Sequence, residues 1–272
     1  MPPPHNPMPT LADAYRVAPG SRVRLTAELA SDRRAFDGDK AQAQDVLDRL
    51  TTRLSELLEI LYAEHRHKLL IVLQAMDTGG KDSTIRDVFA GAGPQGVRVV
   101  PFKTPTQEEL DHDYLWRIHH QVPAKGECVI FNRSHYEDVL IVRVRGLVPT
   151  TVWRRRYEHI TSFERMLTDE GTTVVKFFLH IDKDEQGRRL AERQQNPRKR
   201  WKFDAHDLEE RRRWTDYMAA YEEAIARTST PRAPWYVVPA NKKWYRNLMV
   251  ASALVRSLDG LRMRFPNAPV MK

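Results

Sequence analysis

The sequence predicts an α/β fold, a three-layer α/β/α sandwich in which helices cover both faces of a parallel sheet. Short apolar runs rich in branched residues recur along the chain, as in strands that are buried on both faces. Segments long enough for a crossover helix separate these runs, an alternation typical of βαβ units. Because no repeat or flexible linker divides the 272 residues, we expect one domain over residues 1–272.

The first elements are predicted within residues 1–89. Residues 1–38 are expected to form a polar, irregular N-terminal arm, partly disordered, because five of the first nine residues are proline. Leucines recur from Leu47 to Leu61 at steps of one, three or four, which predicts an amphipathic helix over 40–65. The apolar run at 68–74 predicts the central strand, and a helix is expected over 82–89.

The remaining elements follow the same alternation. Further strands are predicted at 97–102, 128–131, 173–181 and 235–238, and further helices at 106–121, 150–168, 183–194, 204–227 and 241–258.

Composition indicates a folded protein with surplus positive charge. The 44 Lys and Arg residues outnumber the 36 Asp and Glu residues, and the net charge of +8 favours a polyanion as partner: nucleic acid, anionic lipid, nucleotide or a phosphate polymer. The single cysteine, Cys128, excludes an internal disulfide and indicates a cytoplasmic location, where it is expected to be a small buried hydrophobe. No apolar run approaches the roughly 18 residues of a membrane span, so no membrane association is expected.

Residues 75–83, Ala-Met-Asp-Thr-Gly-Gly-Lys-Asp-Ser, lie between a predicted strand and a predicted helix. A glycine turn, a lysine and a helix N-terminus direct backbone N–H groups and an ammonium at one phosphate. We therefore expect a phosphate-binding loop, although Ala75 replaces the first glycine of the usual pattern and Asp82 replaces its metal-binding Ser or Thr. The expected phosphate contacts are Thr78, Gly79, Gly80, Lys81, Asp82 and Ser83. An ordinary turn with a solvated lysine is the alternative.

Asp77 is an unusual residue for a loop that binds phosphate. Its carboxylate would repel phosphate unless a cation lay between them, so it is expected to bind Mg²⁺ or to orient an acceptor phosphate. Asp82 has a simpler explanation as an acid in the first helical turn.

A second polar group follows the strand at 128–131. If this strand neighbours the central one, its polar end lies beside the glycine loop. Asn132 is then expected to hold a metal or its waters, Arg133 to bind phosphate, and Glu137 or Asp138 to complete the metal's ligands. A capped polar loop is the alternative. His135 lies in this group and allows a phosphohistidine intermediate as a minor alternative.

A basic segment follows the helix predicted at 183–194. Residues 193–202 contain five basic residues and no acid, and Asn196-Pro197 ends the helix before it. Such a segment is expected to act as a mobile lid, over about 190–213, whose arginines neutralise a transferring phosphoryl group. A solvated charge run or a nucleic-acid patch is the alternative.

Five motifs together resemble the polyphosphate kinase 2 family: residues 75–83, Pro-Phe-Lys-Thr-Pro-Thr (101–106), Phe-Asn-Arg-Ser-His-Tyr-Glu-Asp-Val-Leu (131–140), Asn-Pro-x-x-Arg-Trp-Lys (196–202) and Asn-Lys-Lys-Trp-Tyr-Arg-Asn (241–247). The resemblance covers about 20–265. It implies a P-loop (Walker A) kinase fold like that of thymidylate kinase, in a homotetramer. It also implies reversible, Mg²⁺-dependent (or Mn²⁺-dependent) transfer of a terminal phosphoryl group between inorganic polyphosphate and a nucleotide. The 132–138 motif resembles class III members, which use AMP and ADP and form ADP and ATP.

The resemblance also implies residue roles. Asp77 would bind metal and orient the acceptor, Lys81 would bridge donor and acceptor phosphates, and Arg133 would hold phosphate. Arg193 and Arg198 would be the lid arginines. Many family members have Asp at the position of Asn132, so Glu137 would compensate for the lost charge at the metal.

A long anion would explain the basic residues beyond one nucleotide site. The polyphosphate track is hypothesised to consist of Lys103, Lys199, Arg200, Lys202, Lys242, Lys243 and Arg246. An ATP-dependent nucleoside monophosphate kinase on the same fold is the runner-up. A nucleic-acid-binding protein is disfavoured because only Trp201 and Phe203 interleave with the basic run.

Overall fold

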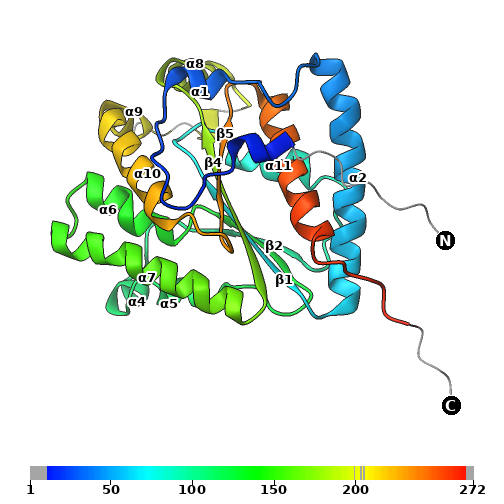
Figure 1. Cartoon of the computed structure of the whole chain (residues 1–272). Coiled ribbons are helices and arrows are strands. Elements are labelled where there is room, and N and C mark those ends of the chain that lie inside the picture. Colours follow the sequence, from blue (N-terminus) through cyan, green and yellow to red (C-terminus); the bar gives the residue numbers. More distant parts are fainter. Residues whose placement is uncertain (1–10, 199, 203, 205, 268–272) are drawn as a thin grey trace.

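A computed structural model describes residues 11–198, 200–202, 204 and 206–267, without the side chain of Lys202. Within these residues five strands form one sheet, in which every neighbouring pair is parallel and the order is β2-β3-β1-β4-β5. The strands are β1 (Lys68–Gln74), β2 (Val97–Pro101), β3 (Cys128–Asn132), β4 (Thr172–His180) and β5 (Trp235–Pro239). Helices cover both faces of the sheet (Figure 1), which confirms the predicted three-layer α/β sandwich.

The central strand β1 is buried because it pairs on both sides. Leu69 lies opposite Cys128 of β3 and Thr173 of β4. Side chains alternate along the strand, so Leu69, Ile71 and Leu73 enter one hydrophobic core while Leu70 and Val72 enter the other.

The first core lies under α2 (Lys40–Glu64), α3 (Lys81–Val88) and α11 (Lys243–Asp259). Asp39 caps α2 with a reciprocal capping box to Gln42, and the buried leucines of α2 face α11. The second core lies under α6 (Ile141–Val144), α7 (Thr150–Asp169) and α10 (Trp214–Thr228). None of the helices in the described part of the chain has the length and apolar character needed to cross a membrane.

The N-terminal arm is more ordered than the sequence predicts from residue 11 onward. It contains a 3-10 helix, η1 (Leu11–Tyr15), and a short helix, α1 (Ala27–Ser31). Tyr15 explains this order, because its hydroxyl hydrogen bonds to the Tyr245 hydroxyl at 2.6 Å. The Val17 amide also donates to the Trp235 carbonyl at 2.8 Å. The expected disorder of residues 1–10 lies outside the described residues.

Two predicted helices are wrong in extent, because each is interrupted. The helix predicted at 106–121 is two short helices, α4 (Gln107–Asp111) and α5 (Trp116–His119). Between them Asp113 accepts a hydrogen bond from the Leu115 amide at 2.9 Å, and such local bonds compete with a continuous helix. The helix predicted at 204–227 is α9 (His206–Arg212) followed by α10, because Arg213 has non-helical backbone angles at the start of α10.

Candidate active site

The glycine loop and the polar end of β3 meet at one edge of the sheet. Leu73 of β1 lies opposite Asn132 of β3, so the segments that follow these two residues are neighbours, as the sequence predicts. The Arg133 guanidinium donates to the Asp77 carboxylate at 2.8 Å. Arg133 has a φ of 64°, a left-handed conformation that a non-glycine residue adopts at a cost of order 1–3 kcal/mol.

The glycines make the loop tight. A β-carbon at Gly79 would lie 2.5 Å from the Ala75 β-carbon and 2.9 Å from the Met76 carbonyl oxygen. Gly80 has a φ of 103° and is the N-cap of α3 without a side-chain cap. The backbone therefore turns directly into the N-terminus of α3, where N–H groups can donate hydrogen bonds to an anion.

The ammonium of Lys81 folds back over the loop. It donates to the Ala75 carbonyl oxygen at 3.1 Å. Burial, and then the adjacent Arg133, lower the pKa of Lys81 to about 8, although Asp77 and Glu137 oppose the shift. An additional anion beside this buried lysine would favour its charged form.

The polar side chains that follow β3 have different partners. Asn132 donates its amide to Asp82 at 2.9 Å. Glu137 lies near Arg133 and Lys81, and burial raises the pKa of Glu137 against the pull of these two cations. Asp138 faces away, because it pairs with Arg156 at 3.0 Å. Of the two acids that the sequence left open, Glu137 is the one that faces the loop.

The basic segment begins where the sequence predicts. Helix α8 (Lys183–Gln195) ends at Asn196, and a 3-10 helix, η3 (Arg200–Lys202), follows. Arg193 pairs with Asp207 of α9 at 3.4 Å. Arg198 and Arg200 are exposed. Lys199 lies outside the described residues.

Asp207 is a site residue that sequence reasoning missed. Burial, and then the charge of Asp77, raise the pKa of Asp207 to about 6, although Arg193 and Arg133 lower it. This interaction with Asp77 and Arg133 means that α9 brings a carboxylate toward the loop. The only sequence signal was an acid in the first turn of a helix after the basic run.

Arg189 is a second missed residue, and it ties α8 to the loop. Its side chain is 5% exposed and donates to the carbonyl oxygens of Thr78 at 3.0 Å and Ala240 at 2.7 Å. Gln186 also donates to the Asp77 carbonyl oxygen at 3.3 Å. These hydrogen bonds hold helix α8 against the loop.

Some residues of the expected polyphosphate track are exposed, and one of them is buried. Lys103, Lys242 and Lys243 are exposed, and they follow strands β2 and β5 at the same edge of the sheet as the loop. Arg246 does not belong to an exposed track, because it is fully buried.

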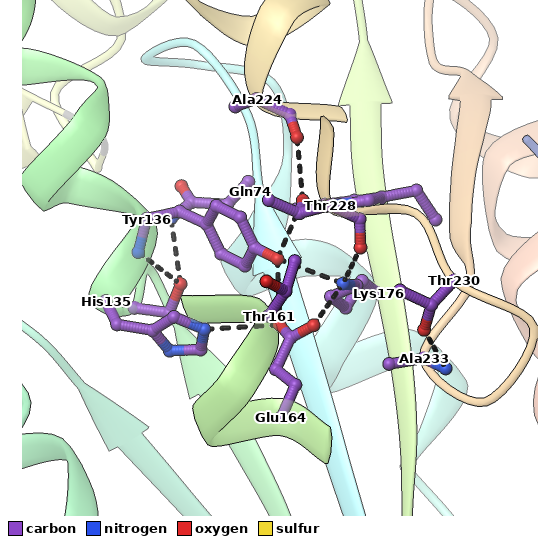
Figure 2. A network of polar contacts seen from close by, with 12 residues as sticks. Gln74, His135, Tyr136, Thr161, Glu164, Lys176, Ala224, Thr228, Thr230 and Ala233 are labelled. Atoms are coloured by element: carbon purple, nitrogen blue, oxygen red, sulfur yellow. Dashed lines mark hydrogen bonds and ion pairs between the residues drawn. The ribbon is translucent and has the colours of Figure 1, made fainter. Parts of the chain in front are cut away.

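A buried polar network lies beneath the β3 end (Figure 2). Lys176 of β4 donates to Glu164 of α7 at 2.5 Å, to the Tyr136 hydroxyl at 2.9 Å and to the Thr228 carbonyl oxygen at 2.8 Å. His135 belongs to this network, since its Nε2 lies 3.3 Å from Glu164 and its ring is fully buried. This burial removes the structural basis for a phosphohistidine intermediate.

The parallel sheet, the glycine loop between β1 and α3, and the basic segment after α8 form the architecture of a P-loop kinase. A family model described as "Polyphosphate kinase 2 (PPK2)" matches residues 37–266. The chain therefore belongs to the polyphosphate kinase 2 family.

Individual relatives agree with this assignment. The AMP/ADP-polyphosphate phosphotransferase of Meiothermus ruber is 61% identical over 93% of this chain and 94% of that protein. The ADP-polyphosphate phosphotransferase of Rhodopseudomonas palustris is 42% identical over 93% of this chain and 91% of that protein. The crystal structure of polyphosphate kinase 2 from Arthrobacter aurescens TC1 is 45% identical, with a TM-score of 0.93 over 97% of this chain and 94% of that chain.

Proposed function

We propose that the protein transfers the terminal phosphoryl group of inorganic polyphosphate to ADP and AMP, giving ATP and ADP, in a reversible reaction. The observation that carries this proposal is Asp77, a carboxylate inside a phosphate loop, held at 2.8 Å by Arg133. An acid at that position suits a site that aligns two phosphate groups through a cation. The name of the 61% identical relative supports polyphosphate as donor and both nucleotides as acceptors.

Phosphoryl transfer by a kinase calls for a divalent cation, and we propose Mg²⁺, with Mn²⁺ as a substitute. Among the described residues no group of three or more His, Cys, Asp or Glu side chains could hold a metal. Two carboxylates, Asp77 and Glu137, with the Asn132 amide oxygen, nevertheless fit Mg²⁺, which usually takes few protein ligands and retains waters and phosphate oxygens. When bound, the cation would screen the repulsion between the phosphates.

The protein's own residues would align the substrates. The loop amides and Lys81 would hold the end of polyphosphate, while Arg133 and Asp77 orient the acceptor. An oxygen of the acceptor phosphate attacks the terminal phosphorus, and the bond to the next bridging oxygen breaks, so the leaving group is polyphosphate shortened by one unit. Arg193 would leave Asp207, and with Arg198 would neutralise the charge on the transferring group.

The rest of the polyphosphate would lie along basic residues, of which Lys103, Arg200, Lys242 and Lys243 are exposed. The proposed track consists of Lys103, Lys199, Arg200, Lys202, Lys242 and Lys243. Arg200→Glu should weaken binding of long polyphosphate, while Arg49→Glu, an exposed change on α2, serves as the control. Equal affinities of the two variants would remove Arg200 from the track.

Incubation of the protein with ADP, Mg²⁺ and purified polyphosphate, without ATP, tests the proposed function. ATP should form, and its absence at every polyphosphate length would overturn the proposal in favour of an ATP-dependent kinase. Salt-sensitive DNA binding without phosphotransfer would favour a nucleic-acid-binding protein. The homotetramer and the cytoplasmic location stay predictions.

A further inference from the structure

Arg246 is a buried cation directly behind the phosphate loop. It is on α11 and is fully buried. Its Nε and Nη2 atoms donate to the Asn247 side-chain oxygen at 3.0 and 2.8 Å, and Nη2 also donates to the Ser83 hydroxyl at 3.1 Å. Ser83 is in the first turn of α3, so the guanidinium is held against the start of that helix.

The third nitrogen, Nη1, points at the loop itself. This atom is buried and has no hydrogen-bond partner among the described residues. A β-carbon on Gly80 would lie 1.9 Å from it, so Nη1 occupies the space that any other residue at position 80 would fill. Glycine at the N-cap of α3 therefore allows the guanidinium to approach the loop backbone closely.

The charge of Arg246 is poorly compensated within the protein. Its hydrogen-bond partners among the described residues, Asn247 and Ser83, are neutral, and Asp87 is linked to it through the Asn247 amide, which donates to the Asp87 carboxylate at 3.2 Å. Burial, and then Arg189, lower the pKa of Arg246 to about 9, although Asp87 opposes the shift, so the group is still charged at neutral pH. A buried cation beside a helix N-terminus is unfavourable unless an anion comes near.

We propose that Arg246 is a positioning residue of the phosphate loop, which attracts the polyphosphate group held there from behind the backbone of Gly80. This inference rests on the proposed function, because it assigns the bound anion to the donor. The attraction is electrostatic and requires no contact: a phosphate in the loop adds negative charge beside Arg246, in addition to the charge of Asp87. The loop thus gains a fixed cation that is independent of the lid.

A charge transposition separates this role from a structural one. In the double variant Asp87→Asn/Asn247→Asp the carboxylate and the amide exchange places, so the net charge and every hydrogen bond of the Arg246 side chain are retained. The new carboxylate would lie directly against the guanidinium and neutralise it. Affinity for inorganic tripolyphosphate, measured by calorimetry, should fall at least about threefold. The matched control Asp87→Asn removes an acid and should leave binding unchanged or tighter.

The outcomes distinguish the two proposals. If the natural protein does not bind tripolyphosphate, the proposed function fails. If it binds and the double variant binds equally well, Arg246 has only a structural role and this inference is overturned. Should the double variant not fold, Arg246→Lys and Arg246→Gln decide the question: Lys, which keeps the charge, should bind tripolyphosphate more tightly than Gln, and equal affinities would overturn the inference.

Discussion

Arg133 donates to Asp77 across 2.8 Å, and this hydrogen bond joins the segment that follows β3 to the loop that follows β1. The pair forms because parallel neighbours bring their carboxyl ends to one edge of the sheet. It fixes an acid and a cation where two phosphates are proposed to meet.

The Asp77→Asn variant should fold but lose most of its turnover. The amide keeps the shape of the side chain and removes the charge proposed to hold the metal and the acceptor. We expect polyphosphate-dependent ATP formation to fall by about 10² or more, as for the loss of other preorganised electrostatic groups. Asp45→Asn, an exposed change on α2, is the control. Retained activity in Asp77→Asn would remove Asp77 from both roles.

Gly79→Ala should disrupt the phosphate loop. Its β-carbon would collide with Ala75 and the Met76 carbonyl oxygen, and such overpacking costs about 1–3 kcal/mol. Thermal unfolding should show this loss, and tripolyphosphate binding should weaken. Gly93→Ala is the matched control, because no described atom beyond the glycine and its two chain neighbours lies within 4 Å of its β-carbon. Equal stability and binding in the two variants would show that the loop is not as tight as described.

Asp207 should produce a specific pH dependence of stability. Its pKa is raised from an ordinary value of 3.8 to about 6, so the folded protein binds this proton more tightly than the unfolded chain. The stability that this proton contributes is present below about pH 4 and is lost as the pH rises through about 6. Asp207→Asn cannot ionise, so its Tm relative to the natural protein should rise from pH 4 to pH 7.

The control for this effect is Asp216→Asn, an exposed change on α10. Its Tm difference from the natural protein should stay constant over the same range. A constant difference for Asp207→Asn as well would contradict the raised pKa of Asp207 in the folded protein.

Substitutions in the buried network under the β3 end should have non-additive effects on stability. Glu164→Gln leaves the Lys176 ammonium without its counter-charge, and losing one partner of a buried pair costs about 3–5 kcal/mol. Urea unfolding should show that the double variant Glu164→Gln/Lys176→Met loses less than the sum of its two single variants. Glu158→Gln, an exposed change on the same helix, should have little effect. Additive losses would mean that the two groups do not depend on one another.

The sequence predicts the strands and the place of the loop because both depend on local pattern. Buried parallel strands are continuous apolar runs, so the strand at 68–74 and the strands beside it can be recognised in the sequence. Periodicity does not predict the interruption of the helix expected at 106–121, because a local hydrogen bond of Asp113 competes there with the helical hydrogen bonds.

Burial explains why the candidate site was predicted only in part. Asp77, Lys81 and Arg133 lie in motifs next to strand ends, where the sequence indicates their neighbours. Sequence patterns show that Arg246 is basic, but they do not show that α11 directs it under Gly80. The position of Asp207 depends in the same way on how α9 packs.

A comparison of two donors with one acceptor shows whether polyphosphate or ATP is the phosphoryl donor. Purified protein, AMP and Mg²⁺ are incubated with either polyphosphate or ATP, and kcat/KM is measured for each donor. The proposed function requires that polyphosphate converts AMP to ADP and then ATP, with the higher kcat/KM. Phosphorylation of AMP by ATP and none by polyphosphate would contradict it.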